Sequence, residues 1–174
     1  FEKETGFQDA LTGVYIKMTA QQLYGRELTF GMVDGLAGQF NGLTNANQYY
    51  STITYDYDEA NFIQKSGDVF ENSYNSIANL NMLIENVDAR PSSFFTGVNY
   101  HTIRGEAYGV RAFLHFDLLR LYGSAIASKG ETTPALPYVD RISTLPTARI
   151  TSRAFLDRVL EDLAVAEQEL AGSD

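Results

Sequence analysis

The residues best suited to chemistry lie between Gln39 and Phe62, where tyrosines alternate with asparagine and glutamine. Flat aromatic rings can stack on sugar rings, and side-chain amides can hydrogen-bond to sugar hydroxyls. No charged residue occurs between Asp34 and Asp56, which suits an uncharged ligand. This combination favours a site for a neutral saccharide. The predicted ligand-binding residues are Tyr49, Tyr50, Tyr55, Tyr57, Asn61 and Phe62.

Two other roles are open for the same aromatic residues. Because loops rich in tyrosine and asparagine are also ordinary protein surface, the rings can cover neighbouring helices or form a contact surface for a partner protein. The chain contains no tryptophan, so the strongest stacking platform for a sugar is missing.

A carboxylate cluster at Asp56, Asp58 and Glu59 suggests a second kind of chemistry. A calcium loop beginning at Asp56 requires glycine at its sixth position and glutamate at its twelfth, but Asn61 and Gly67 stand there. A glycoside hydrolase needs an acid and base pair with one raised pKa, and the sequence shows no apolar pocket around these residues. We expect a solvated loop, with a cation site as the alternative.

The sequence offers little else for catalysis. It has no cysteine, no phosphate-binding glycine-rich loop and no nucleophile elbow. Its histidines, His101 and His115, would lie about 21 Å apart on one helix, too far to share a metal ion. We therefore expect a non-catalytic protein with no cofactor and no metal. The net charge of −9 argues against binding to nucleic acid or to an anionic membrane.

The most periodic stretch, from Arg104 to Gly123, predicts the central helix of the fold. Its apolar residues recur every three to four positions. Gly105, Gly109 and Ala112 share one strip of this helix, and the two glycines together disfavour helix by about 2 kcal/mol. Close contact with another helix would offset that cost. We expect Gly123 to end the helix in the left-handed conformation.

Three further helices are predicted from the same periodicity. They run from about Thr5 to Leu23, from Asp68 to Arg90, and from a cap at Thr151 or Ser152 to about Leu170. Residues 26–67 predict a long irregular segment with one short helix, and residues 124–150 an extended connector. A link of about ten residues, ending near Asn99 as the N-cap of the central helix, makes the second and central helices antiparallel. The fold class is all-α, built on a helical hairpin.

The last helix is expected to bury its leucine-rich face. The residues predicted to face inward are Leu156, Val159, Leu160, Leu163 and Leu170, and those predicted to face outward are Glu161, Asp162, Glu167 and Glu169.

Several stretches together resemble the SusD/RagB family of outer-membrane nutrient-binding lipoproteins. Residues 7–18, residues 69–87, and residues 135–141 with the helix after them resemble family segments in the same order. The signature helix of the family is matched by Gly105, Glu106, Arg111, Phe113, Asp117, Tyr122 and Gly123, which we interpret as structural. The chain departs from the family at Phe70, where tryptophan is frequent.

The resemblance implies tetratricopeptide-like helix packing, and it implies that residues 1–174 form the N-terminal α-helical domain of a longer protein. It also implies non-catalytic capture of an oligosaccharide or similar nutrient at the cell surface, with delivery to a SusC-like TonB-dependent outer-membrane transporter. A lipid anchor on a cysteine outside this sequence would attach the protein to the membrane. Composition and spacing alone support only an acidic helical domain, so a helical scaffold that binds a peptide or protein is the alternative.

Overall fold

The computed structural model describes residues 1–171, which divide into two compact units. The first unit combines residues 1–14 with the chain from residue 76 onward, and the second contains residues 15–75. Most of the described chain is helical and its two strands are short, so the prediction of an all-α fold is confirmed. Within residues 1–171, no helix combines the length and the apolar character needed to cross a membrane.

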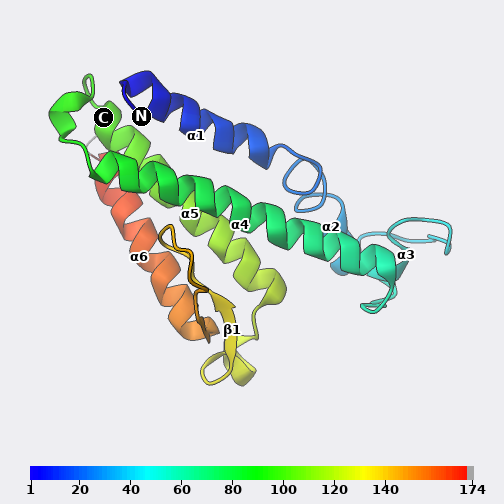
Figure 1. The fold of residues 1–174 in the computed structure, drawn as a ribbon. Helices are drawn as coiled ribbons and strands as arrows, with labels where there is room; N and C mark the ends of the chain where they lie inside the picture. The colour runs from blue at the N-terminus through cyan, green and yellow to red at the C-terminus, as the bar shows by residue number, and fades with distance from the viewer. Residues whose placement is uncertain (172–174) are drawn as a thin grey trace. The chain divides into compact units, whose positions relative to one another are not determined.

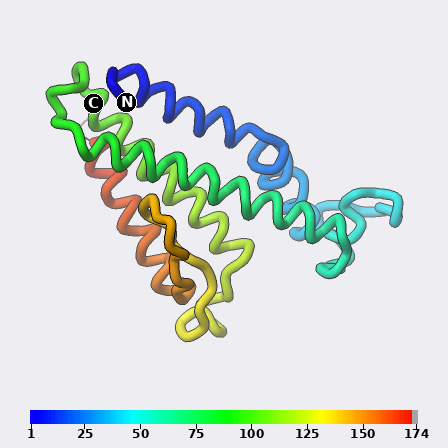
Figure 2. The backbone as a smooth tube through the Cα atoms, viewed as in Figure 1, coloured from blue at the N-terminus to red at the C-terminus, as the bar shows by residue number. Residues whose placement is uncertain are grey.

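Figure 1 shows the elements along the chain, and Figure 2 traces the same backbone as a tube. The helices are α1 (Glu4–Met18), α2 (Met32–Leu36), α3 (Tyr50–Ile53), α4 (Ala60–Asp88), α5 (Asn99–Tyr122) and α6 (Ser152–Ala171). Two helical turns, η1 (Ser92–Phe94) and η2 (Ile126–Gly130), precede and follow α5. Strands β1 (Pro134–Pro137) and β2 (Arg149–Thr151) form a small antiparallel hairpin within the connector to α6.

The first unit is built around α5, which packs along α6 (Figure 1). The strip of small residues makes this contact possible, because a side-chain carbon at Gly105 would lie 2.8 Å from Cγ of Leu170. A side-chain carbon at Gly109 would lie 3.5 Å from Cβ of Ala166. Ala112, further along the strip, is fully buried. The predicted close approach of another helix is confirmed, and that helix is α6.

Gly123 follows the last residue of α5, but the predicted left-handed conformation is wrong. Its backbone is extended, with φ −84° and ψ 157°. Its N–H donates to the carbonyl of Leu119 at 2.9 Å, and a side-chain carbon at Gly123 would lie only 2.6 Å from that oxygen. Glycine is therefore required here for space.

An arginine near the start of α5 ties together three helices of the first unit. Arg104 donates to the carboxylate of Asp88 on α4 at 2.7 Å and to that of Glu169 on α6 at 2.6 Å. His101, one turn earlier on α5, also bonds to Glu169, at 2.7 Å. The guanidinium of Arg104 thus pairs with one carboxylate from each neighbouring helix, and these bonds link α4, α5 and α6.

Two turns along α5, Arg111 repeats the arrangement in a more buried setting. It donates to Asn81 on α4 at 2.8 Å, and its Nη2 and Nε each lie 2.7 Å from an oxygen of Asp162 on α6. Each partner of Arg111 precedes the corresponding partner of Arg104 by seven residues, so α5 is antiparallel to both neighbours. We call Arg104 and Arg111 with their partners on α4 and α6 the ionic ladder.

The buried face of α6 differs from the prediction. Its buried residues are Ser152, Phe155, Val159, Asp162 and Ala166. Val159 faces inward as predicted, but Leu160, Leu163 and Leu170 are exposed. Asp162 was expected to face outward, yet its bonds to Arg111 offset the cost of burying its charge. The expectation is therefore wrong for Leu160, Leu163 and Asp162, and also for Glu169, whose carboxylate bonds to His101 and Arg104 on α5. Leu170 is partly exposed, but its side chain lies against Gly105 of α5.

The start of α4 also differs from the prediction. The helix begins at Ala60, eight residues before the expected start at Asp68. Glu59 acts as its cap, since its carboxylate accepts a hydrogen bond from the N–H of Asn61 at 2.8 Å. The helix then continues through Gly67, where a side-chain carbon would meet no atom within 4 Å.

The other observed element boundaries agree only in part with the predicted ones. The helix α1 ends at Met18 rather than near Leu23, because residues 21–30 form a run of turns. The segment between α1 and α4 holds two short helices, α2 and α3, rather than one. Asn99 begins α5 instead of capping it, and its side chain bonds to Glu4. Thr151 does cap α6, because its hydroxyl accepts the N–H of Ala154 at 3.2 Å.

Candidate functional site

Three of the predicted aromatic residues form one cluster in the second unit. The rings of Tyr55 and Tyr57 meet edge to face with centroids 6.3 Å apart, and those of Tyr57 and Phe62 lie 4.9 Å apart. Tyr55 and Tyr57 are 52% and 54% exposed, whereas Phe62 is half-buried. We call these three residues the aromatic cluster. It presents two tyrosine rings to solvent on a support formed by the start of α4.

The backbone of Tyr55 is held in an unusual conformation. Its φ is +55°, and it is the one non-glycine residue with positive φ among residues 1–171. This left-handed backbone conformation costs a non-glycine residue about 1–3 kcal/mol, and it persists only where surrounding contacts enforce it. Here the hydroxyl of Tyr55 donates to the carbonyl of Leu36 at 3.2 Å, and the N–H of Asp56 donates to the carbonyl of Ser51 at 2.9 Å. The orientation of the ring is therefore set before any ligand arrives.

A polar hollow of about 210 Å³ lies in the same segment of the second unit. Its lining combines amides, hydroxyls and two carboxylates, which are groups that pair with sugar hydroxyls. The residues that line it are Asn45, Asn47, Tyr50, Ser51, Asp56, Glu59 and Asn61. Two of the predicted ligand residues, Tyr50 and Asn61, are among them. Asp56 and Glu59 had been considered only as part of a cation or acid-base site. Asn45, Asn47 and Ser51 were not among the predicted ligand-binding residues, although the frequency of asparagine in residues 41–47 was a usable signal.

Glu59 is the best-defined carboxylate of the polar hollow. Desolvation opposes its ionisation, but hydrogen bonds from Asn61, Ser51 and the N–H of Phe62 outweigh this and hold the pKa of Glu59 below its usual range. A general acid in glycoside hydrolysis needs a raised pKa instead. Since Glu59 also caps α4, its observed role is structural, and its oxygens can accept hydrogen bonds from a ligand.

Tyr49 has different neighbours from the aromatic cluster. Its hydroxyl donates to the carboxylate of Glu27 at 3.1 Å, and its ring packs against Phe40 with centroids 5.7 Å apart. Burial, together with the charge of Glu27, raises the pKa of Tyr49 to about 12. Glu27 also accepts the N–H of Met32 at the start of α2. The structure therefore gives Tyr49 a role in holding the second unit together.

A second hollow of the same unit is more strongly charged. It has a volume of about 230 Å³ and is lined by Gln22, Arg26, Glu27, Gln64, Lys65 and Asp68. Fixed charges of both signs suit a neutral sugar less well than the amides of the polar hollow, because their desolvation is costly. We therefore take the aromatic cluster and the polar hollow together as the candidate site.

The signature residues lie in the first unit. Arg111 belongs to the ionic ladder, Gly105 is at the contact with α6, and Asp117 pairs with Arg120 at 3.2 Å. Glu106 and Tyr122 are half-buried along α5, Gly123 follows its last residue, and Phe113 is exposed.

The deepest titratable group of the first unit is His115. Its Nδ1 lies 3.0 Å from the carbonyl of Arg111, and its Nε2 accepts the N–H of Val139 at 3.3 Å. The imidazole stacks on Tyr138 with centroids 3.9 Å apart. Burial lowers the pKa of His115 to about 3, so the ring is neutral. Among residues 1–171, no group of three or more acidic, histidine or cysteine side chains is placed to hold a metal ion.

Comparison with known families gives a match that spans nearly the whole chain. Residues 2–173 match the SusD-like_3 family, described as starch-binding and associating with the outer membrane. The comparison with curated proteins gave no match.

Solved structures share the fold. A SusD superfamily protein from Bacteroides thetaiotaomicron superposes with a TM-score of 0.77 at 17% identity, covering 96% of this chain and 37% of its own. A Bacteroides vulgatus protein, named as a candidate sugar-binding protein, has a TM-score of 0.70 at 20% identity and the corresponding coverages are 95% and 37%. A SusD superfamily protein from the same organism has a TM-score of 0.66 at 20% identity, with coverages of 95% and 34%. The chain thus spans little more than a third of the length of these proteins.

Proposed function

Since the chain belongs to the SusD-like family, we propose that it is part of a non-catalytic protein that binds a neutral oligosaccharide at the outer membrane. The observation that carries this proposal is the presence, in one short segment of the chain, of two exposed tyrosine rings, Tyr55 and Tyr57, and a hollow rich in amides. The rings supply flat apolar faces for a sugar, and the amides supply donors and acceptors for its hydroxyls.

The proposed binding is weak and rapidly reversible. Each aromatic contact contributes about 0.5–1.5 kcal/mol beyond the area it buries, and two open rings cannot enclose a ligand. Because Tyr55 is held in place by its bond to Leu36, little conformational entropy is lost when a sugar binds. Such a site suits a protein that must release its ligand to the next component.

In the proposed mechanism that next component is a SusC-like TonB-dependent outer-membrane transporter. The full-length protein is anchored at the cell surface by a lipid on a cysteine outside residues 1–174, and it covers the transporter as a lid. The tetratricopeptide-like packing proposed for the family would continue from the antiparallel helices α4, α5 and α6 into the rest of the protein. Residues 1–174 are the N-terminal helical part of that protein.

Titration of the purified full-length protein with maltoheptaose, a starch fragment, tests the site. The Tyr57→Ala variant removes the ring shared by both contacts of the aromatic cluster, so we expect about tenfold weaker binding, equivalent to about 1.4 kcal/mol. Tyr55→Ala should weaken binding in the same direction. Calorimetry measures both affinities directly.

The matched control is Tyr49→Phe, which keeps a ring but removes the hydrogen bond to Glu27. We expect it to lower the stability of the second unit and to leave the affinity for maltoheptaose unchanged. If Tyr55→Ala and Tyr57→Ala both bind as tightly as the parent protein, the aromatic cluster is not the sugar platform.

The transporter is tested by isolating the full-length protein from native outer membranes in mild detergent. We expect to recover a large β-barrel transporter together with the protein, at close to one transporter molecule for each molecule of the protein. Recovery of the protein alone, or with other protein partners and no response to glycans, would favour the alternative of a helical scaffold.

A further inference from the structure

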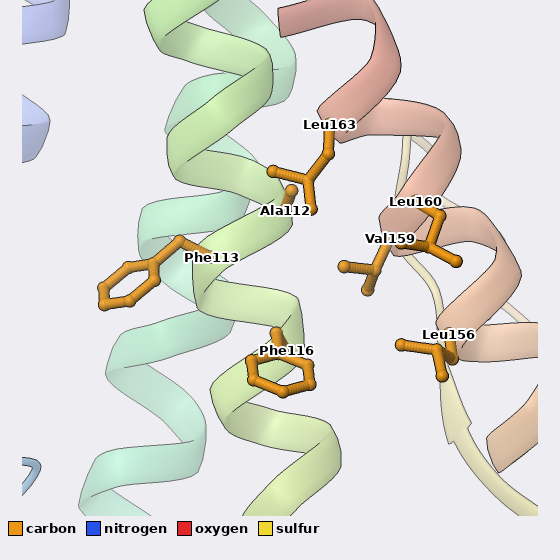
Figure 3. Close-up of a pocket in the computed structure, with 7 residues that line it drawn as sticks. All are labelled: Ala112, Phe113, Phe116, Leu156, Val159, Leu160 and Leu163. Atoms are coloured by element: carbon orange, nitrogen blue, oxygen red, sulfur yellow. The ribbon is translucent and has the colours of Figure 1, made fainter. Parts of the chain in front are cut away.

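Two hollows of the first unit border α6 and differ in their chemistry. One is lined only by apolar side chains, and Figure 3 shows the leucines of α6 facing Ala112 and Phe116 of α5. The other lies at residues 138–148, the loop that joins β1 to β2, and has a volume of about 440 Å³. Two arginines, an aspartate, hydroxyl groups and apolar side chains line it, and we call it the arginine hollow. Its volume is within the range of small-molecule sites, about 300–1,000 Å³.

Three helices of the first unit hold one side of the arginine hollow in place. The N–H of Ile142 donates to the carboxylate of Glu85 on α4 at 2.8 Å. The carbonyl of Asp140 accepts a hydrogen bond from Arg111 on α5 at 3.0 Å, and its carboxylate pairs with Arg158 on α6. This part of the loop is therefore fixed before a ligand binds, which lowers the entropic cost of binding.

Asp140 orients both arginines of the hollow. Its carboxylate accepts Nε of Arg141 at 3.0 Å and a terminal nitrogen of Arg158. Burial opposes the ionisation of Asp140, but the hydrogen bond and charge of Arg141, with the charge of Arg158, outweigh this and lower the pKa of the carboxyl. The aspartate is therefore charged at neutral pH, and the two guanidinium groups leave the lining with one net positive charge.

Arg141 keeps most of its hydrogen-bonding capacity for another molecule. Its side chain is 74% exposed, and within residues 1–171 its hydrogen bond to Asp140 comes from Nε, so both terminal nitrogens are available. Arg158 has less to offer, because its second terminal nitrogen donates to Glu161 at 2.9 Å. A guanidinium with two unused terminal nitrogens matches the two oxygens of a carboxylate.

The remaining lining suits a hydroxylated ring. The hydroxyl of Ser143 accepts the N–H of Leu145 at 3.0 Å, which leaves its own O–H free to donate, and Thr147 supplies a second hydroxyl. Leu145 is 75% exposed and offers an apolar contact. Hydroxyl groups that donate and accept are the usual partners of sugar hydroxyls.

The charge of the surrounding sequence favours an anion at this place. Residues 138–158 hold four arginines and two aspartates, in a protein whose net charge is −9. Local positive charge on an acidic protein attracts an anionic ligand to this part of the surface rather than to the rest. The single net charge of the lining matches a monoanion better than a phosphate dianion.

We propose that the arginine hollow binds the carboxylate of an acidic sugar, such as a hexuronate unit of a polysaccharide. The guanidinium of Arg141 pairs with the carboxylate, the hydroxyls of Ser143 and Thr147 pair with sugar hydroxyls, and Leu145 contacts the apolar side of the ring. This site is additional to the one proposed for a neutral saccharide and does not depend on it.

Titration of the purified full-length protein with D-glucuronate, followed by calorimetry, tests the proposal. Arg141→Ala changes an exposed side chain, so the fold should be retained, and we expect at least about tenfold weaker binding because hydrogen bonds to a charged group are lost. Arg141→Lys keeps the charge but not the paired N–H groups, and it should restore only part of the affinity. The matched control is Arg153→Ala, which removes another arginine of α6, paired with Glu131 at 3.0 Å outside the hollow, and should leave the affinity unchanged.

Maltoheptaose separates this site from the candidate site of the second unit. We expect R141A to bind maltoheptaose as the parent protein does, and Y57A to bind glucuronate as the parent protein does. Loss of maltoheptaose binding alone, with glucuronate still bound and sensitive to R141A, would count against the proposed function and support the arginine hollow.

Three results would overturn the acidic-sugar site. They are the absence of glucuronate binding, equal glucuronate affinity in R141A and R153A, and binding of acetate as tight as that of glucuronate. The last result would mean that the hollow attracts any small carboxylate and does not recognise the sugar.

Discussion

The ionic ladder of the first unit and the candidate site of the second unit use similar side chains in opposite ways. In the ladder, Asn81 and Asp162 are buried, and Arg111 donates to both. Tyr138, next to the ladder, is buried as well. Asp162 also accepts the hydroxyl of Tyr138 at 2.6 Å, and burial raises the pKa of that hydroxyl. In the candidate site, Tyr57 and Asn61 are exposed.

The difference separates structural polar groups from groups available to a ligand. A polar network whose members satisfy one another specifies the fold, but has little capacity left for another molecule. The exposed rings and amides have fewer partners within the protein, and their solvent-facing surfaces can contact a sugar. Burial and bonding, rather than residue type, therefore distinguish the two regions.

Removing one partner of the ladder should have the largest effect. Asp162→Ala leaves the guanidinium of Arg111 buried without its carboxylate, and we expect a loss of about 3–5 kcal/mol in the free energy of unfolding. The control is Glu161→Ala, which removes only an exposed pair with Arg158 and should cost about 0.5 kcal/mol or less. Urea unfolding measures both, and similar costs for D162A and E161A would contradict the buried role of Asp162.

The two regions can be compared directly with one substitution made in each. Asn81 accepts from Arg111 and donates to the carbonyl of Val139 at 2.9 Å, so Asn81→Ala removes both hydrogen bonds in a largely buried setting and should cost about 1–3 kcal/mol. Asn61→Ala changes an exposed side chain and should cost less than about 0.5 kcal/mol. The comparison fails if N61A destabilises the protein as much as N81A in the same urea experiment.

The smallest effect expected is a pH dependence arising from His115. Because its pKa is about 3 when folded and near 6.5 when unfolded, the unfolded state takes up a proton first as the pH falls below 6.5. The free energy of unfolding should therefore decrease by about 1 kcal/mol between pH 6 and pH 5, approaching the limit of about 1.4 kcal/mol per pH unit.

The contribution of His115 is isolated by subtraction. His115→Asn removes the titrating ring, so the variant should show a smaller slope of stability against pH than the parent over the same interval. Identical slopes would mean that the imidazole is already protonated, or open to water, in the folded protein.

The central helix and its packing could be predicted because their signals are local. The period of apolar residues and the strip of Gly105, Gly109 and Ala112 both lie within a few turns of α5, and they led to the correct partner surface. The orientation of α6 could not be predicted in this way. Its buried face depends on Asp162 meeting Arg111, which lies 51 residues away in sequence.

The candidate site also shows that contacts between residues distant in sequence are not predicted from local sequence patterns. The composition of residues 39–62 indicated aromatic rings and amides, and the structure brings Tyr55, Tyr57 and Phe62 together. Tyr49 could not be separated from them by sequence, because its neighbours are determined by Glu27. The binding of a sugar by any of these residues stays a prediction.

The seven-residue interval of the ionic ladder also determines where the chain tolerates a change of length. Inserting one residue between Arg104 and Arg111 would rotate one arginine by about 100° relative to the other, so both could no longer face α4 and α6 together. A deletion there would have the same consequence. By contrast, residues 39–44, which form no helix or strand and precede the lining of the polar hollow, offer a largely exposed segment where insertions are accommodated. Length variation among related chains is thus expected next to the candidate site, while the spacing within α5 stays constant.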